Sequence, residues 1–473
     1  MSIFKKNPGG SAAEAQAEAQ REEGSALDAE TLMRKFDKES NTRIWEGTPA
    51  IIVRIIVVAF SLYCIWSTLF SVAALEKRLT LFMALVTIMG YLTYPASRHH
   101  VRHNYIPWYD FVLMAVGAGC FLFFCLKYDS LVKVLTSASK MTPTFTIIGI
   151  VGLLCLMELC RRCVGIPILC VAGVLLVYTF STGMGVERVL YTLFYTTGGV
   201  LGTPVQVCAK YIVVFIIFGA FLERTGIAEF FIKLANSLVA KVAVISSALC
   251  GMVSGSSVGN TVTTGSVTIP MMKETGYKPE FAGAVEAAAS TGGQIMPPIM
   301  GAAAFLMAEY MNVTYAEVAL RAILPAVLYF TGIFVAVHLE AKKLGLKGIP
   351  RNELPKFSKL LSKIYLLLPL VVLVWLVTTG TRTMAYSATI AILVAIVVSI
   401  IDRDDPITFG RILEALEAGG KGTITVAVAC SMAGVISGCI TATGLASKMI
   451  SAVVSISSSV TVIDPTMVAL FLT

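Results

Sequence analysis

The chain has 473 residues, of which 56% are hydrophobic and only 14% are charged, and its mean hydropathy is +0.80. Soluble domains average about 25% charged residues, so this composition excludes an ordinary soluble protein and favours an all-α polytopic membrane protein. The net charge of +8 is spread over loops between apolar segments, so we read it as a topology signal in a lipid bilayer and expect no nucleic-acid partner.

The motifs expected of a membrane-embedded enzyme or a metal centre are missing from the sequence. There is no HExxH, no Ser–His pair and no pair of aspartates within the spans, so we expect no catalytic residues and no cofactor. Cys160 and Cys163 form a CxxC pair, but neither a second pair nor a His lies nearby. The other cysteines sit mostly in apolar runs, where free thiols behave as small hydrophobic side chains and predict no disulfide framework.

The N-terminal third predicts a polar tail followed by four spanning helices. Residues 1–48 are polar and read as a cytoplasmic tail, and 49–162 as a four-helix membrane domain. Basic residues follow the second helix (98–103) and the fourth (161–162). Because these two loops fall on one side of the membrane when helices alternate, the N-terminus is expected to be cytoplasmic.

The remaining residues, 163–473, predict a second and larger membrane domain. Its expected spans lie at about 166–182, 203–222, 318–339, 364–379 and 384–401, with an interfacial helix at 407–416. The basic run 342–363 places that loop in the cytoplasm. The segment 227–239 fits either an interfacial arm or an ordinary packed helix.

A polar interruption at 251–309 is the centre of this second domain. The strip 243–272 is broken at 254–260 and bounded by charges, which predicts a helical hairpin that enters the membrane from the cytoplasm and returns. A helix over 280–290 is then broken at Gly292–Gly293 and again at Pro297–Pro298. Such paired breaks are typical of transport sites, where exposed carbonyls suit a small cation and helix N-termini suit an anion.

Two further predictions concern the role of Glu286 and the organisation of the C-terminal segment. Glu286 is an ionisable group on a membrane helix, and it fits either a functional role or a hydrogen-bonded structural carboxylate. Residues 422–473 contain another apolar helix that carries small and polar residues, with a break at 441–444. The printed sequence stops within an apolar segment at Thr473, so we expect a truncated chain or a fragment of a longer one.

Two stretches carry a family resemblance, GSSVGNTVTTGSVTIPMMKETGY and FAGAVEAAASTGGQIMPPIMGAAAFLMAEY. They closely resemble the large membrane subunit of tripartite ATP-independent periplasmic (TRAP) transporters, and look most like the TAXI-type branch with fused small and large subunits. The resemblance covers roughly 166–473. It implies an elevator-type ion-transporter fold whose first inverted repeat covers about 205–340 and whose second, about 361–473, is incomplete.

The resemblance also implies a function and a site. The family's activity would be Na⁺-driven import of an organic acid anion across the bacterial inner membrane, with the anion delivered by an extracytoplasmic substrate-binding protein. A channel and an intramembrane enzyme are the weaker alternatives. The residues implied for a first Na⁺ site are Ser254, Gly255, Ser256, Asn260, Gly292, Gly293 and Gln294. Half of a second Na⁺ site would be formed by Thr441, Thr443 and Gly444. The residues implied for substrate are Ser257, Thr264, Glu286, Met296 and Pro297.

Overall fold

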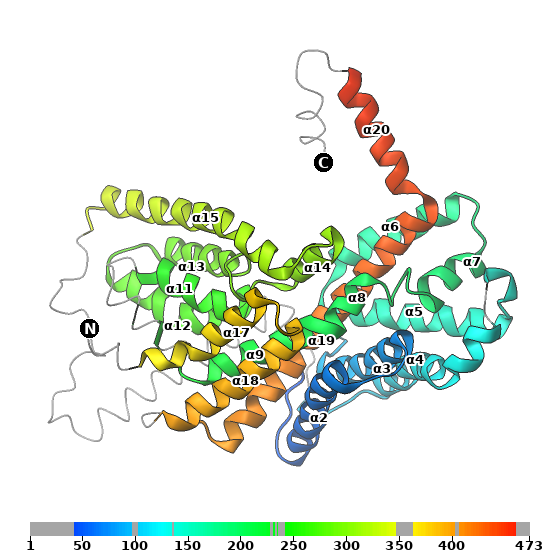
Figure 1. Cartoon of the computed structure of the whole chain (residues 1–473), viewed down its shortest axis with the longest axis horizontal. Coiled ribbons are helices and arrows are strands. Elements are labelled where there is room, and N and C mark those ends of the chain that lie inside the picture. Colours follow the sequence, from blue (N-terminus) through cyan, green and yellow to red (C-terminus); the bar gives the residue numbers. More distant parts are fainter. Residues whose placement is uncertain are drawn as a thin grey trace. The chain divides into compact units, whose positions relative to one another are not determined.

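The computed structural model describes residues 42–96, 103–134, 137–227, 230–231, 234, 242–346, 363–402 and 406–459. Within these ranges every regular element is a helix and there is no strand, which confirms the predicted all-α class (Figure 1). The predicted polar tail, most of the segment 227–239, most of the basic run 342–363 and the last residues lie outside the described ranges.

Several helices have the length and composition needed to cross a membrane. In the described part of the chain seven do so: Thr48–Phe70, Trp108–Val132, Pro143–Cys163, Thr203–Arg224, Tyr315–Lys343, Met384–Ile401 and Phe409–Thr443. The predicted second span forms helix α3 (Leu75–Thr93) and is not among these seven. The chain is therefore a multi-pass membrane protein.

Helix α15 (Tyr315–Lys343) carries an exposed apolar face of the kind that contacts lipid. Leu320, Leu324 and Leu328 follow one another at helical spacing and are 70%, 66% and 63% exposed. A continuous row of exposed leucines is costly in water and favourable in hydrocarbon. Pro325 lies inside this helix.

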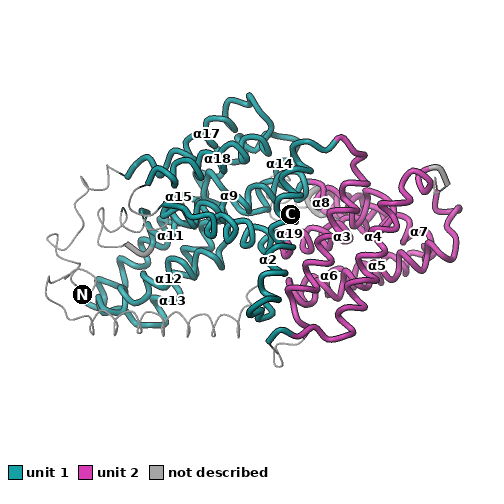
Figure 2. Tube along the Cα trace, turned by 90° about the horizontal axis from the view of Figure 1, so that it is seen from below, with its two compact units in different colours: residues 1–71, 97–104, 207–423 teal, residues 72–96, 105–206, 424–473 magenta. Residues whose placement is uncertain are grey.

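The chain forms two compact units, coloured separately in Figure 2. Unit 1 comprises residues 1–71, 97–104 and 207–423, and unit 2 comprises 72–96, 105–206 and 424–473. The described helices wholly within unit 1 are α2 (Thr48–Phe70), α9 (Val213–Arg224), α11 (Val242–Ser254), α12 (Ser257–Glu274), α13 (Pro279–Gly293), α14 (Ala302–Met311), α15, α17 (Leu368–Thr379) and α18 (Met384–Ile401). The main helices of unit 2 are α3, α4 (Trp108–Val134), α5 (Pro143–Cys163), α6 (Ile166–Ser181), α7 (Val186–Leu190) and α20 (Leu445–Ser459).

Unit 2 contains a buried ion pair on the predicted four-helix segment. Arg162 Nη1 lies 2.7 Å from Asp110 Oδ1, and the two side chains are 1% and 0% exposed. The guanidinium also binds Glu158 through Nε at 2.8 Å and lies 4.8 Å above the ring of Tyr91. The sequence places Arg162 in a basic loop, whereas the structure makes it the centre of a buried cluster at the end of α5.

The expected interfacial helix at 407–416 is wrong as a separate element. The structure has one continuous helix, α19 (Phe409–Thr443), through the glycines at 419, 420 and 422. These glycines allow close packing within unit 1: a Cβ on Gly419 would lie 2.8 Å from Ile217 Cα, and one on Gly420 would lie 2.6 Å from Ser61 Oγ. They are packing positions, and the expected interruption occurs later, at Gly444, where φ is 64°.

Candidate functional site

The predicted hairpin is formed by α11 and α12, which are joined by a two-residue turn. Gly255 adopts φ 62°, a conformation that glycine tolerates at low cost, and Ser256 caps α12 by accepting a hydrogen bond from Gly259 N at 3.2 Å. The break is therefore shorter than the expected 254–260, because Ser257–Asn260 already belong to α12.

The two arms are too short to cross a bilayer comfortably. α11 has 13 residues and α12 has 18, which correspond to about 20 and 27 Å of helix, against about 30 Å of hydrocarbon. A basic residue, Lys273, lies in the last turn of α12. These lengths suit a hairpin whose tip lies within the membrane.

The broken helix differs from the prediction at its glycines. α13 continues through Gly292 and Gly293, and the break spans 294–301 before α14 begins. The reason is packing, because a Cβ on Gly293 would lie 2.5 Å from Gly251 Cα and one on Gly292 would lie 2.6 Å from the ring of Tyr329. Helix α13 can therefore lie directly against α11.

The non-helical segment is held by hydrogen bonds of its own. Gly292 O and Gly293 O accept from Ile295 N and Met296 N at 3.2 Å each, and Gln294 O accepts from Gly301 N at 2.8 Å. Farther along, Tyr315 Oη donates to Pro298 O at 2.8 Å and accepts from Met300 N at 3.2 Å. Each of these carbonyls retains one lone pair for a further ligand.

The hairpin tip and the break lie against each other. Gln294 Nε2 donates to Ser257 Oγ at 3.3 Å, and a Cβ on Gly255 would lie 3.3 Å from Met300 O. Met296 and Pro297 lie half-buried on the same break. Residues about forty positions apart in sequence are thus brought together at one place in unit 1.

Asn260 is buried just behind the tip. Its Nδ2 donates to Ser247 O at 2.8 Å, Ser247 Oγ at 2.9 Å and Ser290 Oγ at 3.2 Å. These contacts orient the amide, and its Oδ1 is buried without a hydrogen-bond partner. An unsatisfied buried acceptor is unusual in a folded protein.

Glu286 is the centre of a second buried network. Its Oε1 accepts from Thr264 Oγ1 and from Ser290 Oγ at 3.2 Å, and its Oε2 accepts from Thr268 Oγ1 at 2.5 Å. Glu286 and Thr264 are both 0% exposed. No Lys, Arg or His in the described residues forms an ion pair with this carboxylate. The geometry is that of the hydrogen-bonded carboxylate, one of the two expectations for Glu286.

The second predicted half-site lies in unit 2. Thr441 Oγ1 donates to Ser437 O at 2.9 Å and Thr443 Oγ1 donates to Cys439 O at 2.8 Å, both within α19. Gly444 then makes the turn into α20 with its φ of 64°. The expected break is therefore present, and the chain beyond 459 lies outside the described residues.

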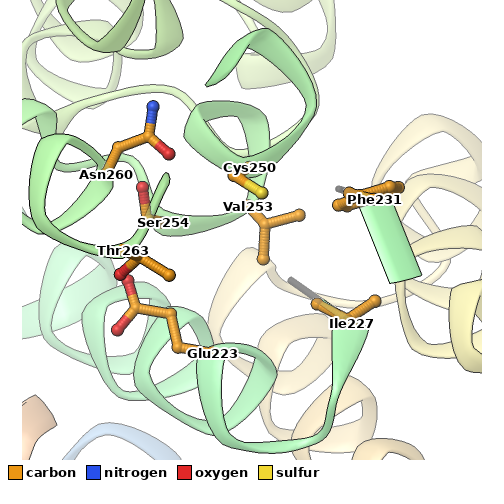
Figure 3. A pocket seen from close by; sticks show the side chains of 8 residues that line it. All are labelled: Glu223, Ile227, Phe231, Cys250, Val253, Ser254, Asn260 and Thr263. Atoms are coloured by element: carbon orange, nitrogen blue, oxygen red, sulfur yellow. The ribbon is translucent and has the colours of Figure 1, made fainter. Parts of the chain in front are cut away.

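Sequence reasoning missed Glu223, which lines a small pocket beside the hairpin (Figure 3). The pocket is formed by the end of α9, by two residues that follow it, by α11 and by α12. Its lining residues are Glu223, Ile227, Phe231, Cys250, Val253, Ser254, Asn260 and Thr263. The available signal was an acidic residue at the end of a strongly apolar span, which in a membrane protein is a candidate functional group.

Comparison with known proteins identifies the family of the chain. The family model described as "Tripartite ATP-independent periplasmic transporter, DctM component" matches residues 151–473. A relative from Vibrio cholerae, named C4-dicarboxylate TRAP transporter large permease protein DctM, is 26% identical over 43% of this chain and 44% of its own length. A protein of the same name from Pseudomonas aeruginosa is 27% identical over 30% of this chain and 34% of its own length.

A third relative, the YgiK protein of Salmonella typhimurium, is 23% identical over 46% of this chain and 52% of its own length. The chain thus matches about half or less of each of these curated relatives. The family model, in contrast, extends over more than half of the chain and includes the hairpin, the broken helix and α19. The chain belongs to the DctM component family of tripartite ATP-independent periplasmic transporters.

Proposed function

We propose that the chain is the membrane component of a Na⁺-coupled importer of an organic acid anion. The observation that carries the proposal is the buried, unpartnered Oδ1 of Asn260 beside a hairpin tip that meets a broken helix. Oxygen acceptors at two helix interruptions within a membrane suit a dehydrated cation, and family membership supports a transporter.

Na⁺ would bind near the contact between the tip and the break. Ser254, Ser256 and Asn260 supply side-chain oxygens, and the carbonyls of Gly255 and Gly292–Gln294 supply backbone oxygens. Because the carbonyls at 292–294 already accept one N–H each, each offers only its second lone pair. The Asn260 amide oxygen is the acceptor with the most to gain from a cation.

The anion would bind on the exposed side of the same contact. Ser257 begins α12 and Gly301 is the N-cap of α14, and helix N-termini favour negative charge through free N–H groups and the helix dipole. Gln294 and Ser257 add polar groups there. The names of the Vibrio and Pseudomonas relatives refer to C4-dicarboxylates, which is consistent with an organic acid anion as substrate.

The wider assignment rests on family membership. In this proposal the chain is a TAXI-type fusion of small and large subunits in the bacterial inner membrane, with a cytoplasmic N-terminus. An extracytoplasmic substrate-binding protein delivers the anion. The mobile part of the elevator would begin at about residue 242, with the hairpin α11–α12 and the broken helix α13–α14 as its first half.

The test is anion uptake by full-length protein in proteoliposomes, with its binding protein and an imposed Na⁺ gradient. We expect Asn260→Ala to reduce the Na⁺-dependent component by about tenfold or more, because it removes the unpartnered acceptor. Thr261→Ala is the matched control, since the Thr261 hydroxyl bonds only to Ser257 O within its own helix. Thr268 would be a poor control because it holds Glu286. The proposal would be contradicted if uptake did not depend on the Na⁺ gradient, or if both variants lost the same fraction of Na⁺-dependent uptake.

A further inference from the structure

Tyr315 is the first residue of α15, and it lies against the broken helix with 4% of its surface exposed. We infer that Tyr315 is a positioning residue of the transport site. Its hydroxyl holds the break at 294–301 against the hairpin tip and so sets the spacing between the two helix interruptions. The inference rests on the proposed function, and it assigns a role to a residue that is itself no ligand.

The Tyr315 hydroxyl replaces two backbone partners that the break has lost. In a continuous helix Met300 N would donate to Met296 O. Pro298 O would accept from Ala302 N in the same way. Instead, Tyr315 Oη donates to Pro298 O at 2.8 Å and accepts from Met300 N at 3.2 Å. A phenolic hydroxyl can donate and accept at once, and backbone groups at membrane depth need such a partner.

The ring of Tyr315 is fixed by two buried phenylalanines from other helices. It stacks on Phe305 of α14, with ring centroids 4.4 Å apart and an interplanar angle of 16°. Its centroid lies 6.0 Å from that of Phe215 on α9, and the two phenylalanine centroids are 4.8 Å apart. Because residues of three helices hold this cluster together, the hydroxyl stays directed at the break.

The residues that Tyr315 holds also pack on the turn of the hairpin. A Cβ on Gly255 would lie 3.3 Å from Met300 O and 3.7 Å from Ile299 Cγ2. A Cβ on Gly301, the N-cap of α14, would lie 3.6 Å from Gly255 O. The same short segment therefore bonds to Tyr315 and contacts the hairpin turn. Loss of the hydroxyl should change the spacing of the two interruptions, and with it the oxygens that they offer to a cation.

A second tyrosine provides a matched control for a purely structural role. Tyr195 is 7% exposed and its Oη donates to Phe145 O at 2.8 Å. Both residues belong to unit 2, outside the proposed site. Tyr195→Phe and Tyr315→Phe each remove one hydroxyl that donates to a backbone carbonyl, so both should lower the melting temperature. A role limited to stability would end there.

The experiment uses the purified full-length chain in lipid nanodiscs without substrate, and it has two readouts. Amide hydrogen exchange, followed by mass spectrometry, reports on peptides that cover 299–301. Binding of radioactive ²²Na⁺, with choline keeping the ionic strength constant, reports on the site. We expect Tyr315→Phe to speed exchange at 299–301 about tenfold, because Met300 N–H loses its acceptor. Na⁺ binding should weaken about five- to tenfold, the equivalent of one net hydrogen bond. Tyr195→Phe should match the parent chain in both readouts.

The outcomes separate this inference from the proposed function. If Tyr315→Phe binds Na⁺ like the parent chain, or leaves exchange at 299–301 unchanged, the inference is overturned and the proposed function stands. Equal weakening by Tyr195→Phe also overturns it, because lost stability then explains the effect. If the parent chain binds no Na⁺, the proposed function is overturned and the inference falls with it.

A second variant keeps the test decisive if Tyr315→Phe does not fold. Phe305→Leu leaves the Tyr315 hydroxyl in place and removes the ring stacked on it. It should weaken Na⁺ binding in the same direction by a smaller factor, because the hydroxyl is then less firmly held. Na⁺ binding equal to that of the parent chain would overturn the inference.

Discussion

The neighbouring residues Arg161 and Arg162 differ in exposure and in the burial of their ion-pair partners. The Arg161 side chain is 43% exposed and pairs with Glu158 at 2.8 Å, an arrangement that contributes little in an aqueous environment. The Arg162 side chain is 1% exposed and its charge is balanced by Asp110, whose side chain is 0% exposed. Losing one partner of such a pair leaves an uncompensated charge in the protein interior.

We therefore expect Arg162→Leu to lower the free energy of unfolding by about 3–5 kcal/mol, because Asp110 is left buried without its cation. Arg161→Leu should change it by less than about 1 kcal/mol. Thermal unfolding of the purified variants in one detergent measures both. Equal melting temperatures for the two variants would contradict the assignment of Arg162 as the buried partner.

At the scale of helices, glycine decides how closely the hairpin packs on the broken helix. Gly251 on α11 and Gly293 on α13 meet so closely that a Cβ on Gly293 would lie 2.5 Å from Gly251 Cα. This contact positions α13, and with it Ser290, near Asn260. Gly283, on the same helix α13, has nothing within 4 Å of its Cβ position.

The same substitution should thus have opposite effects at two positions of one helix. Gly293→Ala forces α11 and α13 apart and is expected to destabilise the protein by about 1–3 kcal/mol. Gly283→Ala meets open space and should stabilise it by up to about 1 kcal/mol, because alanine is the better helix former. Melting temperatures in detergent test the pair. A destabilising Gly283→Ala, or a neutral Gly293→Ala, would contradict the packing described.

For the whole molecule, the helix order and the basic residues predict a consistent topology. Lys342 and Lys343 end α15 on the expected cytoplasmic side. From that end of α15, the turn at 312–314 between α14 and α15 is expected to lie outside. The turn at 275–278 between α12 and α13 is expected to lie inside, because α13 and α14 together would make one crossing.

A membrane-impermeant maleimide applied to intact cells should accordingly label Asn312→Cys and leave Thr275→Cys unlabelled until the cells are opened. Of the native cysteines, only Cys170 has an exposed side chain. Both variants are therefore made with Cys170→Ser, so that the maleimide does not label this residue. Mass shift of the purified protein reports the labelling. Labelling of Thr275→Cys in intact cells would reverse the assigned topology.

Much of the architecture and part of the site could be predicted from the sequence. Helix α18 begins and ends at the predicted residues 384 and 401, and the predicted hairpin, break and 441–444 turn are all present. These features depend on local chemistry, namely long apolar runs and the conformational limits of Gly and Pro. The same reasoning misread the glycines at 292–293 as a break, because a glycine in the sequence is compatible both with a helix break and with close helix packing.

The sequence by itself determined the membrane class, the helix positions and the polar interruption at 251–309, since hydropathy and chain breakers act within a few residues of where they stand. Only the tertiary structure decided which polar groups are satisfied. The threonine donors to Glu286, the ion pair of Arg162 and the approach of Glu223 to the hairpin all join different helices. The oxygen of Asn260 is left unpartnered because the amide nitrogen is held by residues of other helices. Those contacts depend on side-chain direction and interhelical distance, which a one-dimensional pattern does not contain.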